Sequence, residues 1–429
     1  MKKELINSTI YQVYVRNFTN EGTFNALNEK LDYIKDLGID ILYLLPISPI
    51  GKVGRKGDLG SPYSISDYSK INPELGTFED FKSLIKATHD HQMKLMIDIV
   101  FNHTSRDSFI LKHHPSWMYH NKEGNFANKV GDWTDVYDLD TGNPKTISYL
   151  IKILGYYISL GVDGFRFDVA SYINKDFFIK LNKVMSKKYP NIILLAESAF
   201  PNYATYFRSL GFNALSDSEL TIYGFDMLYQ YSSITEMYKY LETKEIRHLD
   251  LYKEALKLEN ILLPNNALRI RGLENHDQKR IYEYTHDFTI MKNLAAYQVF
   301  MKGPMFIYNG LETKADHLEN LFSKDTMNLD IDESWFNFIK LLIKFKKEKF
   351  NQKLLTSNLL DTTNETFAFK NNYEDGSIAF GIFSLTGKEE TITYKDLIDG
   401  TYIDYLTNKE YIIKNNSIST KEPLFLFKK

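Results

Sequence analysis

Eight short apolar runs alternate with longer amphipathic stretches along the first 310 residues of the chain. The short runs are candidate strands, and the longer stretches, whose apolar residues repeat at helical spacing, are candidate helices. Strands that alternate with helices predict right-handed βα units and a parallel sheet. Eight such units over ~300 residues favour an α/β fold, a (β/α)8 TIM barrel, over an open doubly wound sheet. The predicted strands span residues 10–18, 40–47, 94–103, 164–169, 191–198, 213–217, 267–277 and 303–310, and predicted helices include 24–39, 78–93, 144–160 and 175–188.

Two regions interrupt this alternation. Residues 104–143 are rich in turn formers and aromatics and are too long for an ordinary βα loop. From about residue 350 the helical pattern gives way to short strands such as TFAFKNN, SIAFGIFSL and LFLFKK. We therefore predict a catalytic barrel over 1–103 and 144–349, a short inserted domain over 104–143, and a C-terminal antiparallel β-sandwich domain over 350–429.

Composition excludes several classes of protein. A net charge of −3 in 429 residues gives no support for a nucleic-acid or anionic-membrane partner, and the absence of cysteine removes disulfides and thiolate metal sites. No apolar run approaches the ~18 residues of a membrane span, and the N-terminus lacks the apolar core of a signal peptide. We expect a cytoplasmic protein with no membrane association.

Polar side chains gather at the predicted carboxyl ends of the strands, where a (β/α)8 barrel carries its catalytic groups. Within GFRFDVA, Arg166 and Asp168 share one face of a strand because side chains alternate. Bringing like charges together costs free energy, and a site that does so usually serves chemistry. A purely structural salt bridge is therefore the weaker interpretation. The full set comprises Asp98, Asn102 and His103 on the third run, Arg166 and Asp168 on the fourth, Glu197 on the fifth, and Glu274, His276 and Asp277 on the seventh.

Glycoside hydrolysis requires a set of this kind. One ionised carboxylate attacks the anomeric carbon, and a second, protonated, donates to the leaving oxygen. Arg166 beside Asp168 would keep that carboxylate ionised and oriented. Glu197 follows the apolar run IILLA, and a dry environment favours the protonated form that a general acid needs. Asp277 would then hold sugar hydroxyls.

At these residues the chain resembles the α-amylase family of glycoside hydrolases. DIVFNH (98–103), GFRFDVA (164–170), AES (196–198) and ENHDQKR (274–280) match the four short sequence regions of that family in order. SPYSISDYSKINPELGT, YDLD and GPMFIYNGLE are similar to further family segments. The resemblance covers residues 10 to about 315, and the predicted β-domain fits the C domain of the family, as the insertion fits its B domain.

The resemblance implies a catalytic set and a set that binds sugar or orients the nucleophile. The catalytic set is Asp168 as nucleophile, Glu197 as acid/base and Asp277 as transition-state stabiliser. The second set is Tyr63, which stacks on the sugar, Arg166, which orients the nucleophile, Asp98, which supports Arg166, and His103 and His276, which bind hydroxyls. The family retains anomeric configuration, so the two reacting carboxyls should lie ~5–5.5 Å apart. The implied reaction is hydrolysis of α-1,4-glucosidic bonds in maltodextrins, and the implied partner is an α-glucan oligosaccharide.

Departures from the family pattern bear on cofactor and substrate. Many endo-acting amylases follow the nucleophile with a Lys-His pair that binds sugar and calcium, whereas this chain has Ser171 and Tyr172. Asn102 and Asp138 match calcium-ligating positions, but without that histidine we expect no required cofactor and no metal, with calcium as the alternative. Ser64 stands where many exo-acting members carry Asp, which disfavours a strict exo-glucosidase. The short insertion favours soluble oligosaccharides.

Alternatives remain open at the sequence level. The same residues serve a glucosyl transferase, a phosphorylase or an exo-α-glucosidase, because the motifs do not report the acceptor. A non-catalytic sugar-binding relative is a remote alternative, since such proteins usually lose one of the three carboxylates. A metal-dependent hydrolase is another. The oligomeric state is monomer or homodimer.

Histidines and tryptophans outside the motifs have simpler interpretations. The pairs His89/His91 and His113/His114 lack a third ligand at zinc-like spacing and are interpreted as surface residues. Trp133, like Trp117, either lines a sugar subsite or packs the insertion.

Overall fold

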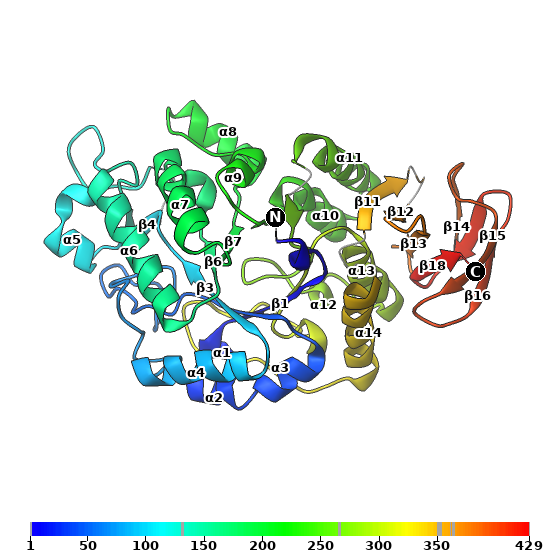
Figure 1. Ribbon diagram of the computed structural model, residues 1–429, viewed down its shortest axis with the longest axis horizontal. Coiled ribbons are helices and arrows are strands. Elements are labelled where there is room, and N and C mark those ends of the chain that lie inside the picture. Colours follow the sequence, from blue (N-terminus) through cyan, green and yellow to red (C-terminus); the bar gives the residue numbers. More distant parts are fainter. Residues whose placement is uncertain are drawn as a thin grey trace. The chain divides into compact units, whose positions relative to one another are not determined.

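Eight parallel strands form the central sheet of the computed structural model (Figure 1). The structure describes residues 2–129, 133–264, 267–349, 354–360, 362 and 365–428. The strand order is β10-β1-β2-β3-β6-β7-β8-β9, and Arg271, just after β9, pairs in parallel with Met305 of β10, so the sheet closes on itself. The predicted (β/α)8 barrel is confirmed. The strands are β1 (Thr9–Val13), β2 (Ile41–Leu44), β3 (Lys94–Ile99), β6 (Gly164–Phe167), β7 (Ile193–Ala196), β8 (Met227–Leu228), β9 (Leu268–Arg269) and β10 (Met305–Tyr308).

The helices begin and end at recognisable signals. Thr77 and Asp80 form a capping box at the start of α4. Asn143 caps α6, which ends at Gly161 in a left-handed conformation with φ of 109°. The predicted helices 144–160 and 175–188 coincide with α6 and α7. The helices are α1 (Val15–Phe18), α2 (Phe24–Asn28), α3 (Leu31–Leu37), α4 (Phe78–Asp90), α5 (Phe109–His113), α6 (Pro144–Leu160), α7 (Lys175–Lys188), α8 (Pro201–Ser209), α9 (Asp217–Ile222), α10 (Tyr231–Thr243), α11 (Ile246–Leu262), α12 (Ile281–Tyr284), α13 (Phe288–Phe300) and α14 (Glu333–Lys349).

The predicted strand over residues 213–217 is wrong. Ser216 accepts a hydrogen bond from the backbone N–H of Glu219, and the Glu219 side chain accepts one from the backbone of Ser216. This capping box starts α9, so the segment leads into a helix. The sixth strand of the barrel is β8, which has only two residues. The first and third predicted strands are also shorter than expected, because the chain turns at Tyr14 into α1 and β3 ends at Ile99.

The insertion after β3 contains a small antiparallel sheet. Its strands are β4 (His103–Ser105) and β5 (Val136–Asp138), with His103 opposite Asp138. Residues 130–132 of the predicted inserted domain lie outside the described residues. The pairing brings the two ends of the insertion together at the end of β3.

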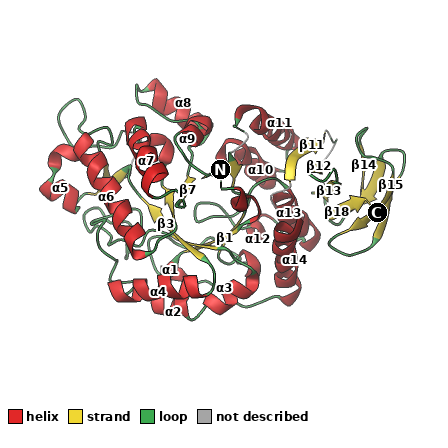
Figure 2. Cartoon of the chain, viewed as in Figure 1, coloured by secondary structure: helices red, strands yellow, loops and turns green. Residues whose placement is uncertain are grey.

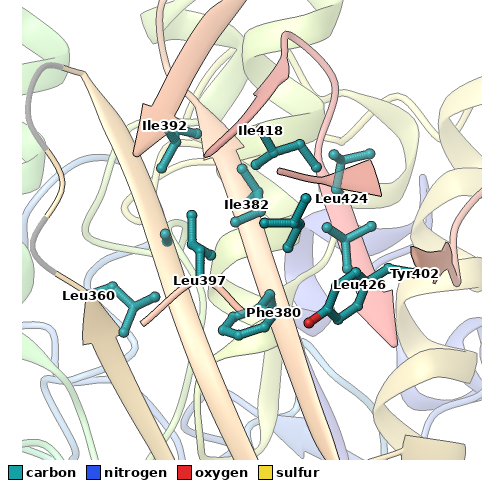
Figure 3. Packing of buried hydrophobic residues seen from close by; sticks show 11 residues of the cluster. Leu360, Phe380, Ile382, Ile392, Leu397, Tyr402, Ile418, Leu424 and Leu426 are labelled. Carbon is teal, nitrogen blue, oxygen red and sulfur yellow. The ribbon is translucent and has the colours of Figure 1, made fainter. Parts of the chain in front are cut away.

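The C-terminal region changes from alternating helices and strands to strands and loops, as Figure 2 shows. A six-stranded antiparallel sheet has the order β11-β12-β13-β18-β15-β16, and β14 pairs with β17. Both sheets contribute to one core, which includes Phe380, Ile382 and Leu426 from the larger sheet and Ile392 and Ile418 from the smaller one (Figure 3). The predicted antiparallel β-domain is confirmed; residues 350–353, at its predicted start, lie outside the described residues. Its strands are β11 (Leu354–Leu360), β12 (Thr366–Tyr373), β13 (Ile378–Ser384), β14 (Glu390–Thr393), β15 (Gly400–Asp404), β16 (Glu410–Ile413), β17 (Ser417–Thr420) and β18 (Leu424–Lys428).

The β-domain packs on the last two helices of the barrel. The ring of Phe300 in α13 lies 5.1 Å from that of Phe425 and 5.9 Å from that of Phe345 in α14. A Cβ at Gly381 would lie 2.6 Å from the Phe300 ring, so this position on β13 requires glycine. Asn371 Nδ2 also donates to the backbone carbonyl of Phe300 at 3.2 Å. The aromatic contacts remove apolar area on both elements from water.

Contacts within the chain divide it into two compact units. One comprises Met1–Ile10, Ser232–Leu318 and Asn328–Lys429, and the other comprises Tyr11–Tyr231 and Glu319–Met327. The predicted domain boundaries follow a different division and stay predictions. Among the described residues, no helix has the length and apolar character needed to cross a membrane.

Candidate active site

Strand register places four charged side chains on one face of the sheet. Asp98 on β3 is the Cα partner of Arg166 on β6, and Arg166 is the partner of Leu195 on β7. Asp168 and Glu197 each follow by two residues, and side chains two apart on an extended chain point to the same side. The backbone N–H of Glu197 still donates to Phe167 at 3.0 Å, so the ladder extends to the strand ends.

One guanidinium contacts three carboxylates. Arg166 is fully buried, and its Nη1 donates to Asp168 Oδ1 and to Asp98 Oδ1, each at 2.9 Å. Its Nη2 lies 3.1 Å from Glu197 Oε2 as an ion pair. Because the two terminal nitrogens of a guanidinium are held in one plane, Asp168 and Glu197 are fixed beside each other.

Asp98 supports this arrangement from behind. Its Oδ2 accepts hydrogen bonds from the hydroxyl of Tyr43 at 2.7 Å and from that of Tyr63 at 3.0 Å. The Arg166 guanidinium carbon lies 5.8 Å from the centre of the Tyr63 ring. Asp98 therefore orients both the arginine and the half-buried tyrosine that the resemblance assigns to sugar stacking.

The backbone beside Asp168 holds Glu197. Val169 has φ of 37° and ψ of 46°, a left-handed conformation that is strained for a β-branched residue. In this conformation its N–H donates to Glu197 Oε2 at 2.7 Å, and the N–H of Ala170 donates to the Glu197 carbonyl at 2.9 Å. Strain at this position thus orients the second reacting carboxylate.

Burial and like charges raise the pKa of Asp168. Desolvation is the largest cause, Arg166 opposes it, and the carboxylates of Glu197 and Asp98 add to it. Three carboxylates share the charge of one guanidinium in a site that excludes most water. Arg166 therefore offsets only part of the cost of ionising buried Asp168, in contrast to the expectation that it keeps this carboxylate ionised.

His103 lies at the edge of the same cluster. Its Nε2 is 3.9 Å from Asp168 Oδ2, and its ring lies 5.1 Å from the ring of Trp133 in the insertion. Burial lowers the pKa of His103 to about 3, so the imidazole is neutral near pH 7. A neutral imidazole beside the reacting carboxylate both donates and accepts hydrogen bonds, as recognition of a sugar hydroxyl requires.

We expect the stability difference between the wild-type protein and a His103→Gln variant to depend on pH. The folded protein keeps His103 neutral down to a pKa of about 3, whereas the unfolded chain binds a proton near pH 6.5. Between these values the unfolded state binds one more proton, so the contribution of His103 falls as the pH falls, by ~1.4 kcal/mol per pH unit. Urea unfolding of both proteins from pH 4 to pH 8 measures this difference. A difference that does not change with pH would contradict it.

Asp277 and His276 belong to the other compact unit. His276 is buried, its Nε2 lies 3.1 Å from Asp277 Oδ2, and the Asp277 side chain is 43% exposed. Glu274 accepts hydrogen bonds from Arg280 Nη1 at 3.1 Å and from the backbone N–H of Ile281 at 2.6 Å, so it supports the following helix. Convergence of Asp277 with Asp168 and Glu197 stays a prediction.

Sequence reasoning missed two tyrosines of this cluster. Tyr43 projects from β2 to Asp98, and the ring of Tyr229 lies 5.3 Å from the Arg166 guanidinium carbon. The apolar run ILYL could have indicated Tyr43, because the hydroxyl of a tyrosine on a buried strand needs a hydrogen-bond partner. Tyr229 follows β8 directly and lies outside the sixth strand that the sequence pattern predicts at 213–217.

The histidine pairs outside the motifs lie in ordinary surface contacts. His89 Nε2 lies 2.8 Å from Asp163 Oδ2, and His91 Nε2 lies 3.0 Å from Asp32 Oδ1. His114 stacks on Trp117 with ring centres 3.8 Å apart. Within the described ranges, no group of three or more histidines and carboxylates is placed to hold a metal ion.

Comparison with known proteins agrees with the fold. A closed (β/α)8 barrel with carboxylates paired at its strand ends and an antiparallel β-domain after it is an architecture of glycoside hydrolases. The family model described as "Alpha amylase, catalytic domain" matches residues 12–116 and 111–337, and the "Bacterial Alpha amylase C-terminal domain" matches residues 362–426. The chain belongs to the α-amylase family of glycoside hydrolases, as its four motifs indicated.

Individual relatives place the chain within a broad family. A crystal structure of an α-amylase from Lactobacillus plantarum has a TM-score of 0.91 and 37% identity, covering 99% of this chain and 100% of that chain. The chain is 29% identical over 71% of its length to Alpha-amylase 3 of Dictyoglomus thermophilum, and likewise to an oligo-1,6-glucosidase of Bacillus cereus. It spans 64% and 65% of the lengths of those two proteins. Because relatives of this chain carry names for different activities, the family alone does not fix the substrate.

Proposed function

We propose that this protein is a retaining glycoside hydrolase that cleaves α-1,4-glucosidic bonds within maltodextrins. The observation that carries the proposal is the contact of one buried guanidinium with both Asp168 and Glu197. A retaining enzyme needs two carboxyls close enough to act on one anomeric centre from its two sides. A separation of ~5–5.5 Å between them is the matching prediction.

In the first step, Asp168 and Glu197 divide nucleophilic and acid roles. A carboxylate oxygen of Asp168 forms a bond to the anomeric carbon as the glycosidic C–O bond breaks, and the leaving oxygen takes the proton of Glu197. Arg166 stabilises the charge on Asp168, and the Val169 N–H holds the Glu197 carboxyl in position.

In the second step, Glu197 acts as a base. It takes a proton from water as the water oxygen bonds to the anomeric carbon and the bond to Asp168 breaks. This restores ionised Asp168 and protonated Glu197, and two inversions leave the anomeric configuration unchanged. Tyr63, His103 and His276 would bind the sugar, and Asp277 would strengthen its hold on hydroxyls in the transition state.

The environment of Ser64 supports internal cleavage over release of single end units. Ser64 is buried, and its hydroxyl donates to the backbone carbonyl of Asp135 at 3.0 Å, which directs it into the insertion. It therefore offers no carboxylate to hold a chain end. Solved α-amylases of this fold include one from Geobacillus thermoleovorans in complex with acarbose, which supports a linear α-glucan as substrate here.

The test of this proposal combines maltoheptaose with a Glu197→Gln variant. We expect wild-type protein to release mixed short maltodextrins whose new ends are first formed as the α-anomer, measured by proton NMR. Glu197→Gln should lose ~10²–10⁴-fold in rate on maltoheptaose, because proton donation is lost. It should lose far less in the first-turnover release of fluoride from α-maltosyl fluoride, because fluoride leaves without a proton and the base step has not yet been reached.

The matched control for this test is a carboxylate that lies outside the proposed catalytic set. Glu254→Gln removes an exposed carboxylate of α11 and should leave both rates unchanged. Initial formation of the β-anomer would refute retention. A loss in first-turnover fluoride release as large as the loss on maltoheptaose would refute the acid role of Glu197. Glucose as the sole early product would replace internal cleavage with exo action. Products that appear only with phosphate or a sugar acceptor would point to a phosphorylase or transferase.

A further inference from the structure

A lysine ammonium lies inside the base of the insertion. Lys129 keeps only 12% of its side chain exposed. Its Nζ donates to the backbone carbonyl of Leu139 at 3.3 Å and lies 3.9 Å from Asp138 Oδ2. The same Asp138 oxygen accepts from the Lys129 backbone N–H at 2.9 Å. A charge this far from water is held by the oxygens around it.

Both oxygens on the Lys129 ammonium come from the Asp138–Leu139 end of the insertion, and this end is hydrogen-bonded to Asn102, just before the other end. Asp138 is 2% exposed and stands opposite His103 in the β4–β5 pair. Asn102 Nδ2 lies 3.4 Å from Asp138 Oδ1, and the Asn102 carbonyl accepts from the Leu139 N–H at 2.9 Å. The Oδ1 of Asn102 is buried without a hydrogen-bond partner. A carboxylate and a main-chain carbonyl thus lie at the Lys129 ammonium, next to the sugar-binding candidate His103.

This oxygen set does not fit a divalent cation while Lys129 is present. Calcium takes six to eight oxygen ligands at about 2.3–2.6 Å. Here Asp138 is the carboxylate on the Lys129 ammonium, and that ammonium lies where it would repel a second cation from the same oxygens. The Lys129 ammonium therefore disfavours calcium binding at Asn102 and Asp138, the alternative that the sequence left open.

We propose that the ammonium of Lys129 is the built-in cation of this site and makes the insertion and His103 independent of calcium. The lysine neutralises Asp138 and joins residue 129 to the Asp138–Leu139 segment. Because His103 is directly paired with Asp138, the same contacts keep the imidazole in position. This inference concerns the insertion itself and does not depend on the reaction proposed for the barrel.

Thermal unfolding with calcium chloride or with a chelator tests this inference. We expect the unfolding midpoint of the wild-type protein to be the same under both conditions. Lys129→Ala should lower the midpoint by roughly 5–10 °C, because it leaves a buried carboxylate without its counter-charge. Calcium chloride should raise the midpoint of Lys129→Ala and not that of wild type, since the vacated oxygens then attract a cation.

Matched variants distinguish this role from a general effect of losing a lysine. Lys122→Ala removes an exposed lysine from the same insertion and should leave the midpoint unchanged. A wild-type midpoint that falls with chelator overturns the inference, as does a Lys129→Ala midpoint equal to wild type. If Lys129→Ala does not fold, the double variant Lys129→Met/Asp138→Asn removes both charges. Recovery of folding in that variant supports the charge pairing, and failure to recover it overturns the inference.

Discussion

The Asp168→Asn variant is expected to lose activity while gaining stability. The activity loss follows from removal of the nucleophile, and should reach about 10⁴- to 10⁶-fold in kcat, the range seen when a covalent catalytic set loses a member. The gain in stability follows from the site. Burial and the neighbouring carboxylates raise the pKa of Asp168, so its ionised form costs free energy in the folded protein. Asn carries no charge and still accepts from Arg166 through Oδ1.

The raised pKa of Asp168 sets the pH dependence of this gain in stability. A carboxyl with a raised pKa in the folded state destabilises that state progressively as the pH rises above the ordinary carboxyl range of about 4. The advantage of Asp168→Asn should therefore grow from acidic to neutral pH. Urea unfolding at pH 5 and pH 7.5, with rates on maltoheptaose, measures both effects. If Asp168→Asn is less stable than wild type at pH 7.5, Asp168 stabilises the folded protein. If Asp168→Asn keeps full activity, Asp168 is not the nucleophile.

The charged face of the barrel could be predicted because it depends on rules that sequence displays. Side chains two apart on a strand share a face, and this spacing alone links Arg166 to Asp168. The carboxyl ends of parallel strands meet at one end of a barrel, which adds Asp98 and Glu197. The family motifs then supply roles. Each of these inferences rests on short-range spacing within an apolar run.

The parts that could not be predicted depend on contacts between distant segments. The sixth strand has two residues and exists through its pairing with β7, so its own sequence carries little periodicity. Tyr229, which follows it, was missed for that reason. Lys129 lies in a turn-rich segment that resembles exposed loop sequence, and its burial depends on β4 pairing with β5. The meeting of Asp277 with Asp168 likewise depends on long-range arrangement and stays a prediction.

Removal of the shared guanidinium is expected to be the most destabilising single change in the site. Arg166→Gln leaves the carboxylates of Asp98, Asp168 and Glu197 buried without a counter-charge. Breaking a buried ion pair by deleting one partner costs about 3–5 kcal/mol of unfolding free energy. The pKa of Asp168 should rise further, since Arg166 is the group that lowers it. Any residual activity should therefore have its acidic limb displaced to higher pH.

A double-mutant cycle separates this charge effect from lost packing. Asp98→Asn removes the carboxylate that accepts two contacts from Arg166 and keeps nearly the same shape. If charge dominates, Arg166→Gln should cost less in an Asp98→Asn background than in wild type, with a coupling of ~0.5–3 kcal/mol by urea unfolding. Lys122→Ala, which removes an exposed positive charge, serves as the control and should show no coupling to Asp98→Asn. Strict additivity of Arg166→Gln and Asp98→Asn would mean that Arg166 acts through its volume. The hypothesis that a shared guanidinium orients Asp168 would then be refuted.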